Sequence, residues 1–232
     1  MIIWAIVPVK PLRDSKSRLS HILSPDERAD LTRGILGHTL EVLEDVKGIF
    51  RTLVVSRDPA VLKVARQHGA STFGESDRQD LNMALTRATH IAVAQQANSV
   101  LVLPSDLPFL TPADVEMMIT GVELDGRNGN GNGYHYQKRA ITICTDHNND
   151  GTNALLVSPP TGFTFRYGPD SFNQHLEEAA RLGMSRRIVH APGIKFDLDT
   201  ERDWKTYRVM AVGETVPAPM MNQQAMIFSG SS

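Results

Sequence analysis

The sequence has very little cysteine and lacks the signatures of several common enzyme classes. Its 232 residues include one cysteine, Cys144, which excludes an intrachain disulfide framework and a cysteine-rich zinc site. The eight histidines show no metal-binding spacing. No serine or cysteine stands in a nucleophile elbow, and the Walker pattern and the dinucleotide glycine fingerprint are missing. Covalent hydrolases, P-loop phosphotransferases and dehydrogenases are therefore disfavoured.

The sequence also lacks a strong excess of charge and a long apolar run. The formal net charge is -2, with acids and bases spread along the chain, so nothing indicates a general attraction to nucleic acid or to an anionic membrane. The apolar opening, residues 1–9, has no basic leader and is too short to span a bilayer. Together with the single cysteine, which suits a reducing compartment, this predicts a cytoplasmic protein whose anion binding is local.

Predicted strands and helices alternate along the chain. Buried runs of β-forming residues predict strands at residues 2–7, 51–56, 70–73, 99–103, 140–144 and 154–157. Capping residues and apolar spacing predict helices at 24–46, 58–69, 81–97, from 111 onward, and 171–183. Alternation of this kind indicates an α/β protein with a mainly parallel sheet flanked by helices.

The length fits one α/β domain, which we assign to residues 1–212. Within it, residues 125–133 are rich in glycine and asparagine without apolar periodicity, so we expect a mobile surface insertion. Residues 213–232, with Pro217 and Pro219 and little charge, form a C-terminal tail that is either disordered or packed on a partner subunit.

Four cations follow the first predicted strand directly: Lys10, Arg13, Lys16 and Arg18. Open α/β sheets bind their ligands at the carboxyl ends of their strands, so this position favours an anion. The four charges are enough to neutralise a triphosphate, with forked hydrogen bonds from arginine and point charges from lysine. The alternative is an ordinary solvated basic loop.

Three acids are candidates for a metal site. Asp106 follows a buried strand and should project from the same edge of the sheet as the basic loop. Asp197 and Asp199 stand two residues apart in an expected extended run, which places them on one face about 6 to 7 Å apart at the backbone. A magnesium ion would relieve the repulsion between such carboxylates. Alternatively, Asp106 caps a turn and the other two face solvent beside a helix cap at Thr200.

Two polar turns, residues 150–153 and 166–171, flank a predicted strand and offer backbone N–H groups and hydroxyls to a second anion. Ser171 also looks like the cap of the helix that follows. The two roles are compatible, because a helix N-terminus both needs a cap and attracts phosphate.

Taken in order, these motifs resemble the 2-phospho-L-lactate or phosphoenolpyruvate guanylyltransferases of coenzyme F420 biosynthesis, which are glycosyltransferase A-like nucleotidyltransferases. The resemblance runs from about residue 1 to residue 203. It rests on VPVK at 7–10, KSRL at 16–19, LNMAL at 81–85, LPSDLP at 103–108, GTNALL at 151–156, YGPDSF at 167–172 and DLD at 197–199. Asp80 departs from the pattern, since the family usually has glycine there.

The resemblance implies a fold and a set of site residues. The fold is a single-domain, Rossmann-like three-layer α/β/α sandwich with a mixed, mainly parallel central sheet, similar to nucleotide-diphospho-sugar transferases. The implied roles are Mg²⁺ binding by Asp106, Asp197 and Asp199, catalytic contacts to the triphosphate by Lys10, Lys16 and Arg18, further nucleotide contacts by Arg13 and Asn82, and acceptor binding by Thr152, Gly168 and Ser171.

The implied activity is transfer of GMP from GTP to a phosphorylated three-carbon acid with release of pyrophosphate. The sequence leaves the acceptor open between phosphoenolpyruvate, 2-phospho-L-lactate and 3-phosphoglycerate. Rival functions are another nucleotidyltransferase or a nucleotide-sugar glycosyltransferase of the same fold, and a non-catalytic nucleotide sensor. We expect no nucleic-acid or membrane partner. A homodimer, and handover of a labile product to the next enzyme, are both compatible with the sequence.

Overall fold

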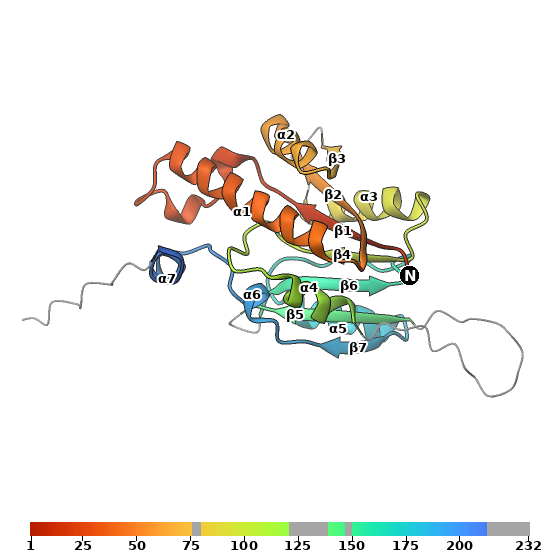
Figure 1. Cartoon of the computed structure of the whole chain (residues 1–232). Coiled ribbons are helices and arrows are strands. Elements are labelled where there is room, and N and C mark those ends of the chain that lie inside the picture. The colour runs from red at the N-terminus through yellow and green to blue at the C-terminus, as the bar shows by residue number, and fades with distance from the viewer. Residues whose placement is uncertain (76–79, 121–138, 147–149, 213–232) are drawn as a thin grey trace, which may run out of the picture.

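The computed structural model describes residues 1–75, 80–120, 139–146 and 150–212 (Figure 1). The predicted insertion at 125–133 and the predicted tail at 213–232 lie outside the described residues. Within the described ranges, no helix is long and apolar enough to cross a membrane.

One seven-stranded sheet organises the described residues, in the order β3-β2-β1-β4-β6-β5-β7. The strands are β1 (Ile3–Pro8), β2 (Ile49–Ser56), β3 (Ser71–Gly74), β4 (Ser99–Val102), β5 (Ala140–Thr145), β6 (Thr152–Ser158) and β7 (Ser185–Ile188). The pairs β1–β2, β1–β4, β2–β3 and β5–β7 are parallel, while β6 runs antiparallel to both β4 and β5. The sheet is therefore mixed and mainly parallel, as predicted.

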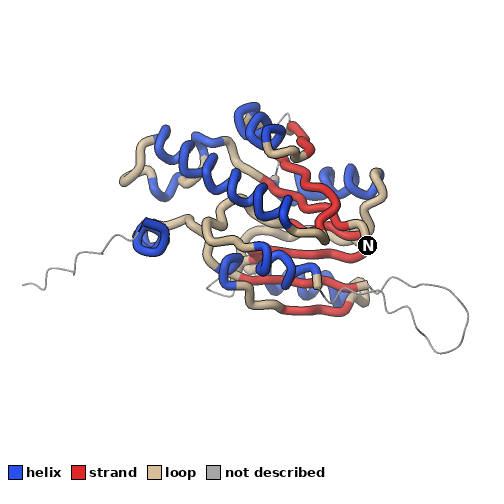
Figure 2. The backbone as a smooth tube through the Cα atoms, in the orientation of Figure 1, coloured by secondary structure: helices blue, strands red, loops and turns tan. Residues whose placement is uncertain are grey.

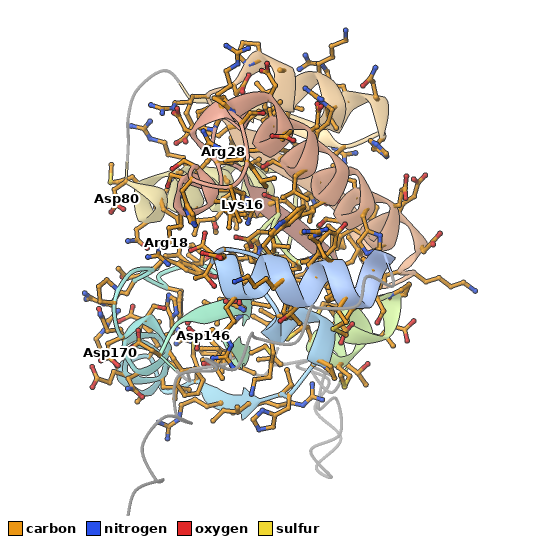
Figure 3. All side chains as sticks on the ribbon, turned by 90° about the vertical axis from the view of Figure 1, so that its left-hand side faces the viewer. Lys16, Arg18, Arg28, Asp80, Asp146 and Asp170 are labelled. Atoms are coloured by element: carbon orange, nitrogen blue, oxygen red, sulfur yellow. The ribbon has the colours of Figure 1, made fainter. Side chains whose placement is uncertain are left out.

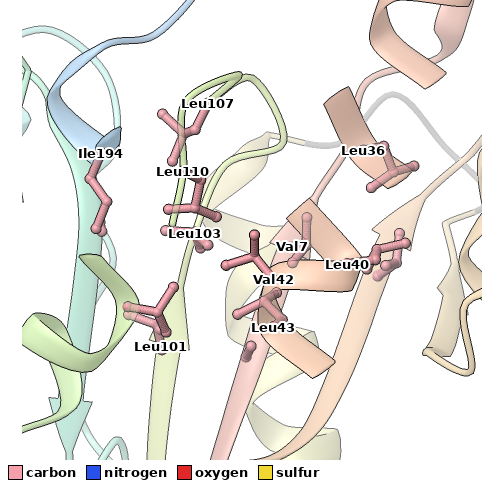
Figure 4. Packing of buried hydrophobic residues seen from close by; sticks show 14 of the residues in the cluster. Val7, Leu36, Leu40, Val42, Leu43, Leu101, Leu103, Leu107, Leu110 and Ile194 are labelled. Atoms are coloured by element: carbon pink, nitrogen blue, oxygen red, sulfur yellow. The ribbon is translucent and has the colours of Figure 1, made fainter. Parts of the chain in front are cut away.

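Helices cover both faces of the sheet, which confirms the three-layer prediction (Figures 1 and 2). On one face lie α1 (Pro25–Asp45), α2 (Pro59–Gln67), α4 (Pro112–Ile119) and α6 (Pro192–Lys195); on the other lie α3 (Leu81–Ala94) and α5 (Ser171–Arg181). The last described helix, α7 (Glu201–Val212), follows α6. Successive residues of β1 point to opposite faces. Val7 therefore joins the cluster of α1, seen in Figure 4, and Ile6 joins the cluster of α3.

The predicted helix starts are present. Ser24 and Glu27 form a capping box at α1, as do Thr111 and Asp114 at α4, and the Asp58 side chain accepts the Ala60 N–H at α2. These side chains accept hydrogen bonds from backbone N–H groups that have no partner within the helix. Because the capping residues are close in sequence to the helix start, the sequence alone predicted where these helices begin.

Some elements differ from the prediction. The helix expected at 81–97 ends at Ala94, before Gln96 with φ 68°, and the one expected at 171–183 ends at Arg181, before Gly183 with φ 65°. The strand β7 was not expected because its four residues are exposed and mostly polar. The one-turn helix α6 was not expected either, and the polar helix α7 was expected only through the alternative in which Thr200 is a helix cap.

The segments that carry the predicted site residues lie together at one edge of the sheet. The parallel strands β1 and β4 end there, and the chain continues into the basic loop and the Asp106 loop. Because β6 runs the opposite way, its first residue, Thr152, lies at this same edge, paired with Thr145 at the end of β5. The segment between α6 and α7 also returns there, since the Leu198 N–H donates to the Asp106 carbonyl at 3.0 Å.

Candidate active site

The basic loop after β1 has a fixed shape, with two short 3-10 helices at Leu12–Asp14 and Ser17–Leu19. The buried Arg28 of α1 donates to the Ser15 carbonyl at 2.8 Å, and Asp58 accepts the Leu12 N–H at 2.9 Å. Buried charges are stabilising only when paired or hydrogen-bonded, so these contacts tie the loop firmly to two helices. Sequence reasoning missed Arg28 as a supporting residue and predicted Asp58 only as a helix cap.

Lys16 points into the site. Its backbone has φ 54° and ψ 37°, the left-handed region that residues other than glycine seldom adopt. Its side chain is only 5% exposed, and its Nζ lies 3.2 Å from Asp106 Oδ2. The loop therefore places the lysine ammonium group against Asp106, the predicted metal-binding acid that follows the neighbouring strand β4.

Arg18 pairs with a second predicted acid. Its Nη1 lies 2.8 Å from Asp199 Oδ2, and the two side chains are 69% and 38% exposed. Ion pairs this exposed contribute about 0 to 1 kcal/mol, because solvent screens them. The Arg18–Asp199 pair is therefore easily exchanged for other partners.

Asp197 is the second predicted metal-binding acid that lies within electrostatic reach of Asp106. Burial raises the pKa of its carboxyl group, and the nearby charge of Asp106 raises that pKa further. Asn153, which donates to the Ile194 carbonyl at 2.9 Å, also approaches Asp197 Oδ1 at 3.5 Å. Asp106 and Asp197 thus interact electrostatically.

The acid-bearing segment, residues 196–199, connects α6 to α7 and is not a strand of the sheet. The two acids on it have different partners: Asn153 approaches Asp197 and Asp106 acts on it electrostatically, whereas Asp199 forms an ion pair with Arg18. Thr200 caps α7, as the alternative interpretation expected, through reciprocal bonds with Asp203. Within the described ranges, no three histidine, cysteine or acidic side chains form a group able to hold a metal ion.

A close contact between α6 and α4 positions the start of the acid-bearing segment. Gly193 in α6 donates its N–H to Asp114 Oδ1 at 3.1 Å. A Cβ added at Gly193 would stand 2.4 Å from Asp114 Oδ2 and 2.4 Å from the Phe109 carbonyl oxygen. Only glycine fits between these groups without a shift, so α6 packs directly on the capped start of α4.

The predicted acceptor residues form a separate, neutral cluster. The Thr152 N–H donates to Ser171 Oγ at 2.9 Å, and Thr152 Oγ1 lies 3.0 Å from His175 Nδ1. Gly168, in the adjoining turn, has φ 142° and its carbonyl accepts the Ser171 N–H. All three predicted residues therefore lie together, and His175 joins them.

The prediction that Ser171 caps α5 was wrong. Asp170, with φ 57°, occupies the cap position without a side-chain capping bond, and Ser171 is the first helical residue. Its hydroxyl instead accepts the Thr152 N–H at the start of β6. A contact across 19 positions of sequence overrides the local capping signal.

Asn82 joins α3 to the turn before α5. Its Oδ1 accepts the Tyr167 N–H at 2.6 Å and its Nδ2 donates to the Tyr167 carbonyl at 3.0 Å. Both ends of the amide are therefore used to hold the backbone of the Gly168 turn. This places the predicted nucleotide-binding residue next to the predicted acceptor-binding residues.

The remaining predicted cations lie further out. Lys10 is exposed, and Arg13 pairs with Asp26 of α1 at 3.0 Å. Figure 3 looks onto the site edge and shows Lys16 and Arg18 near its middle, with Asp80, Asp146 and Asp170 around them. The structure thus brings Lys16 and Arg18 to the acids and leaves Arg13 on the α1 side of the loop.

Comparison with known proteins matches this architecture. A family model described as guanylyl transferase CofC like covers residues 3–215. The chain belongs to this family. A phosphoenolpyruvate guanylyltransferase of Rubrobacter xylanophilus is 39% identical over 203 residues, which are 88% of this chain and 92% of the relative. A 2-phospho-L-lactate guanylyltransferase of Methanothermobacter thermautotrophicus is 31% identical over 199 residues, 86% of this chain and 81% of the relative.

Solved structures support the fold of this guanylyltransferase family member. A structure described as a putative nucleotide-diphospho-sugar transferase, from Desulfovibrio desulfuricans, superposes with a TM-score of 0.64 at 15% identity, covering 91% of this chain and 89% of its own. A nucleotidyl transferase of Methanothermobacter thermautotrophicus superposes with a TM-score of 0.59 at 14% identity, covering 90% and 97%. The nucleotide-diphospho-sugar transferase-like fold is therefore confirmed.

Proposed function

We propose that this chain transfers GMP from GTP to phosphoenolpyruvate or 2-phospho-L-lactate, releasing pyrophosphate, in the biosynthesis of coenzyme F420. A phosphate oxygen of the acceptor attacks the α-phosphorus of GTP. The new bond joins that oxygen to the α-phosphorus, and the bond from the α-phosphorus to the β-phosphate bridge oxygen breaks. No protein nucleophile is required, because the acceptor phosphate is already anionic.

The observation that carries the proposal is the meeting of the basic loop with the acids at one edge of the sheet. Lys16 contacts Asp106, and Arg18 contacts Asp199. A nucleotidyltransferase needs cations for a triphosphate beside acids for a metal ion, and here the two sets neutralise each other. When a triphosphate enters, Lys16 and Arg18 turn to its oxygens and leave their acids free.

The acid pair suits magnesium. Asp106 and Asp197 would hold the ion as oxygen ligands. Burial raises the pKa of Asp197 and the charge of Asp106 raises it further, and a bound divalent cation would oppose both effects. Asp199 joins them once Arg18 releases it. When bound, magnesium supplies positive charge to the phosphoryl group that is transferred. Lys10, Lys16 and Arg18 add their charge to the same group, while Arg13 and Asn82 complete the nucleotide contacts.

The neutral cluster suits the acceptor. Thr152, Gly168 and Ser171 lie together at the same edge as the acids and offer two hydroxyls and a turn backbone to an anion. Relatives named for phosphoenolpyruvate and for 2-phospho-L-lactate support an acceptor of the phosphorylated three-carbon acid class. Positioning that acid against the α-phosphorus lowers the entropic cost of the reaction.

Pyrophosphate release tests the proposal. Purified protein is incubated with magnesium and GTP, and with phosphoenolpyruvate, 2-phospho-L-lactate, 3-phosphoglycerate or no acceptor, and ATP and CTP replace GTP as controls. The enzyme that consumes the product is included, because the product is expected to be labile. We expect release only with GTP and one of the first two acceptors. Folded protein that binds GTP but releases no pyrophosphate with any acceptor would favour a sensor or a glycosyltransferase.

A further inference from the structure

The hydrogen-bond partners of Thr152 and Ser171 decide what kind of ligand their hydroxyls can take. A hydroxyl has one hydrogen to donate and lone pairs that accept. The Ser171 oxygen already accepts the Thr152 N–H. Thr152 Oγ1 lies 3.0 Å from His175 Nδ1, so the polarity of its bond depends on which ring nitrogen carries the proton.

A backbone hydrogen bond determines which nitrogen of the His175 ring carries the proton. His175 Nε2 lies 3.0 Å from the Arg166 backbone nitrogen, and a backbone N–H can only donate. Nε2 must therefore be the acceptor, which leaves the proton of a neutral ring on Nδ1. Nδ1 then donates to Thr152 Oγ1. The Thr152 hydroxyl hydrogen remains to donate, as does that of Ser171, and among the described residues neither has a protein acceptor.

The surroundings hold the ring in this state. His175 is fully buried, and the centroid of its ring lies 6.0 Å from that of Phe163 and 4.8 Å from that of Tyr167. Burial is the main reason that the pKa of His175 falls to about 4; Arg166 lowers it further, and Glu178 opposes the change. Glu178 itself is held by Arg181 and by the Thr164 N–H. A ring so enclosed can neither turn over easily nor gain a second proton at neutral pH.

We propose that His175 is a positioning residue that, as a neutral Nδ1–H ring, fixes the Thr152 hydroxyl as a hydrogen-bond donor to the anionic acceptor. With Ser171 in the same state, the site presents two hydroxyl donors and favours a carboxylate or phosphate over a neutral alcohol or amide. This inference rests on the proposed function, since it deepens the acceptor half of that site.

A double-mutant cycle tests the inference. In His175→Phe the Thr152 hydroxyl is free to turn, and we expect the half-saturating acceptor concentration to rise about tenfold or more, while that for GTP is unchanged. Thr152→Val removes the hydroxyl at nearly constant shape, and Thr152→Ser keeps it. In the Thr152→Val background, His175→Phe should change the half-saturating acceptor concentration less than about twofold, because its route of action is gone.

Two outcomes of the cycle would overturn the inference. One is an unchanged acceptor dependence in His175→Phe. The other is an equally large effect of His175→Phe in both backgrounds, which would mean that the ring merely supports the Arg166 turn. The same substitution at His90, an exposed residue of α3, is the matched control and should leave both substrate dependences unchanged.

A spectroscopic test does not depend on turnover. Nitrogen NMR of the ¹⁵N-histidine-labelled wild-type protein at pH 7 distinguishes the two tautomers, with His175→Phe assigning the signal. We expect the Nδ1–H form, with and without phosphoenolpyruvate. An Nε2–H or doubly protonated ring would sink the inference even in an active enzyme. If wild-type protein instead shows the Nδ1–H form but no acceptor-dependent pyrophosphate release, the proposed function fails and the positioning geometry stands.

Discussion

The two halves of the candidate site are held together by different forces. The charged half joins the basic loop to Asp106 and Asp199 through two ion pairs, one of them largely exposed, and Asp197 adds a further acid whose pKa is raised by burial and by the charge of Asp106. The neutral half joins Thr152, Ser171 and His175 through buried hydrogen bonds. Exposed ion pairs change partners at little cost, whereas breaking buried hydrogen bonds is expensive. The charged half is thus suited to exchange its partners for a metal-bound nucleotide, and the neutral half to receive a ligand without rearranging.

The strongest test of this contrast removes Asp197, the acid of the charged half whose pKa is raised by burial and by the charge of Asp106. Asp197→Asn should lower turnover about a thousandfold or more, because it deletes a proposed metal ligand, and should leave the melting temperature close to that of the wild type. Pyrophosphate release and thermal unfolding are measured together. Asp30→Asn, at an exposed acid paired with Arg33 on α1, is the control. Near-normal turnover of Asp197→Asn would contradict the metal role.

Acid titration tests the neutral half. The pKa of His175 is about 4 in the folded protein, below its ordinary 6.5, so the folded state favours the neutral ring. The stability this contributes is fully present above pH 6.5 and is lost as the pH falls from 6.5 to 4, by up to about 3 kcal/mol. Urea unfolding at several pH values measures the loss. The pH slope in this window should be smaller in His175→Phe and unchanged in His90→Phe.

A substitution at Asn82 tests whether the turn of the neutral half is held in place before a ligand binds. Asn82→Asp keeps an oxygen for the Tyr167 N–H but places a carboxylate oxygen against the Tyr167 carbonyl, which should cost about 2 kcal/mol of unfolding free energy. Gln95→Glu, the same change at the far end of α3 where the side-chain oxygen accepts from Arg51, should cost much less. A changed GTP dependence would support the proposed nucleotide contact of Asn82, whereas an unchanged unfolding free energy would mean that its two hydrogen bonds to Tyr167 do not hold the turn.

Lys16 gives the smallest expected effect. Lys16→Ala should raise the half-saturating GTP concentration about tenfold, because one charge-assisted contact to the triphosphate is lost. The acceptor dependence should not change. Lys63→Ala, at an exposed lysine of α2, is the matched control. An unchanged GTP dependence would mean that the contact between Lys16 and Asp106 serves the fold alone.

Local signals made most of the fold predictable. Helix caps at Ser24, Asp58 and Thr111 and the buried strand runs depend on neighbouring residues, and all are present. The direction of β6 and the existence of β7 depend on pairing with distant strands. A short exposed edge strand such as β7 leaves no apolar pattern in the sequence.

The sequence predicted the location of those candidate site residues that lie next to the end or the start of a strand. Asp106, Lys16 and Thr152 meet at one edge because parallel strands end there and β6 begins there. Arg28 and His175 were missed because each acts on backbone or side chains that only folding brings near. One signal could have revealed His175: it stands four positions after Ser171, on the same face of the predicted helix.

Gly193 has no side chain, and this limits which substitutions the enzyme can tolerate away from its candidate site. The helix turn that carries Gly193 packs against the start of α4, one of the helices that cover the sheet. Because Asp197 follows four residues later, a side chain at 193 would act as a wedge that displaces the acid. Loss of activity can therefore arise from a helix turn that holds no proposed ligand, and a larger side chain at position 193 would weaken the proposed metal binding although every proposed ligand residue is unchanged in the sequence.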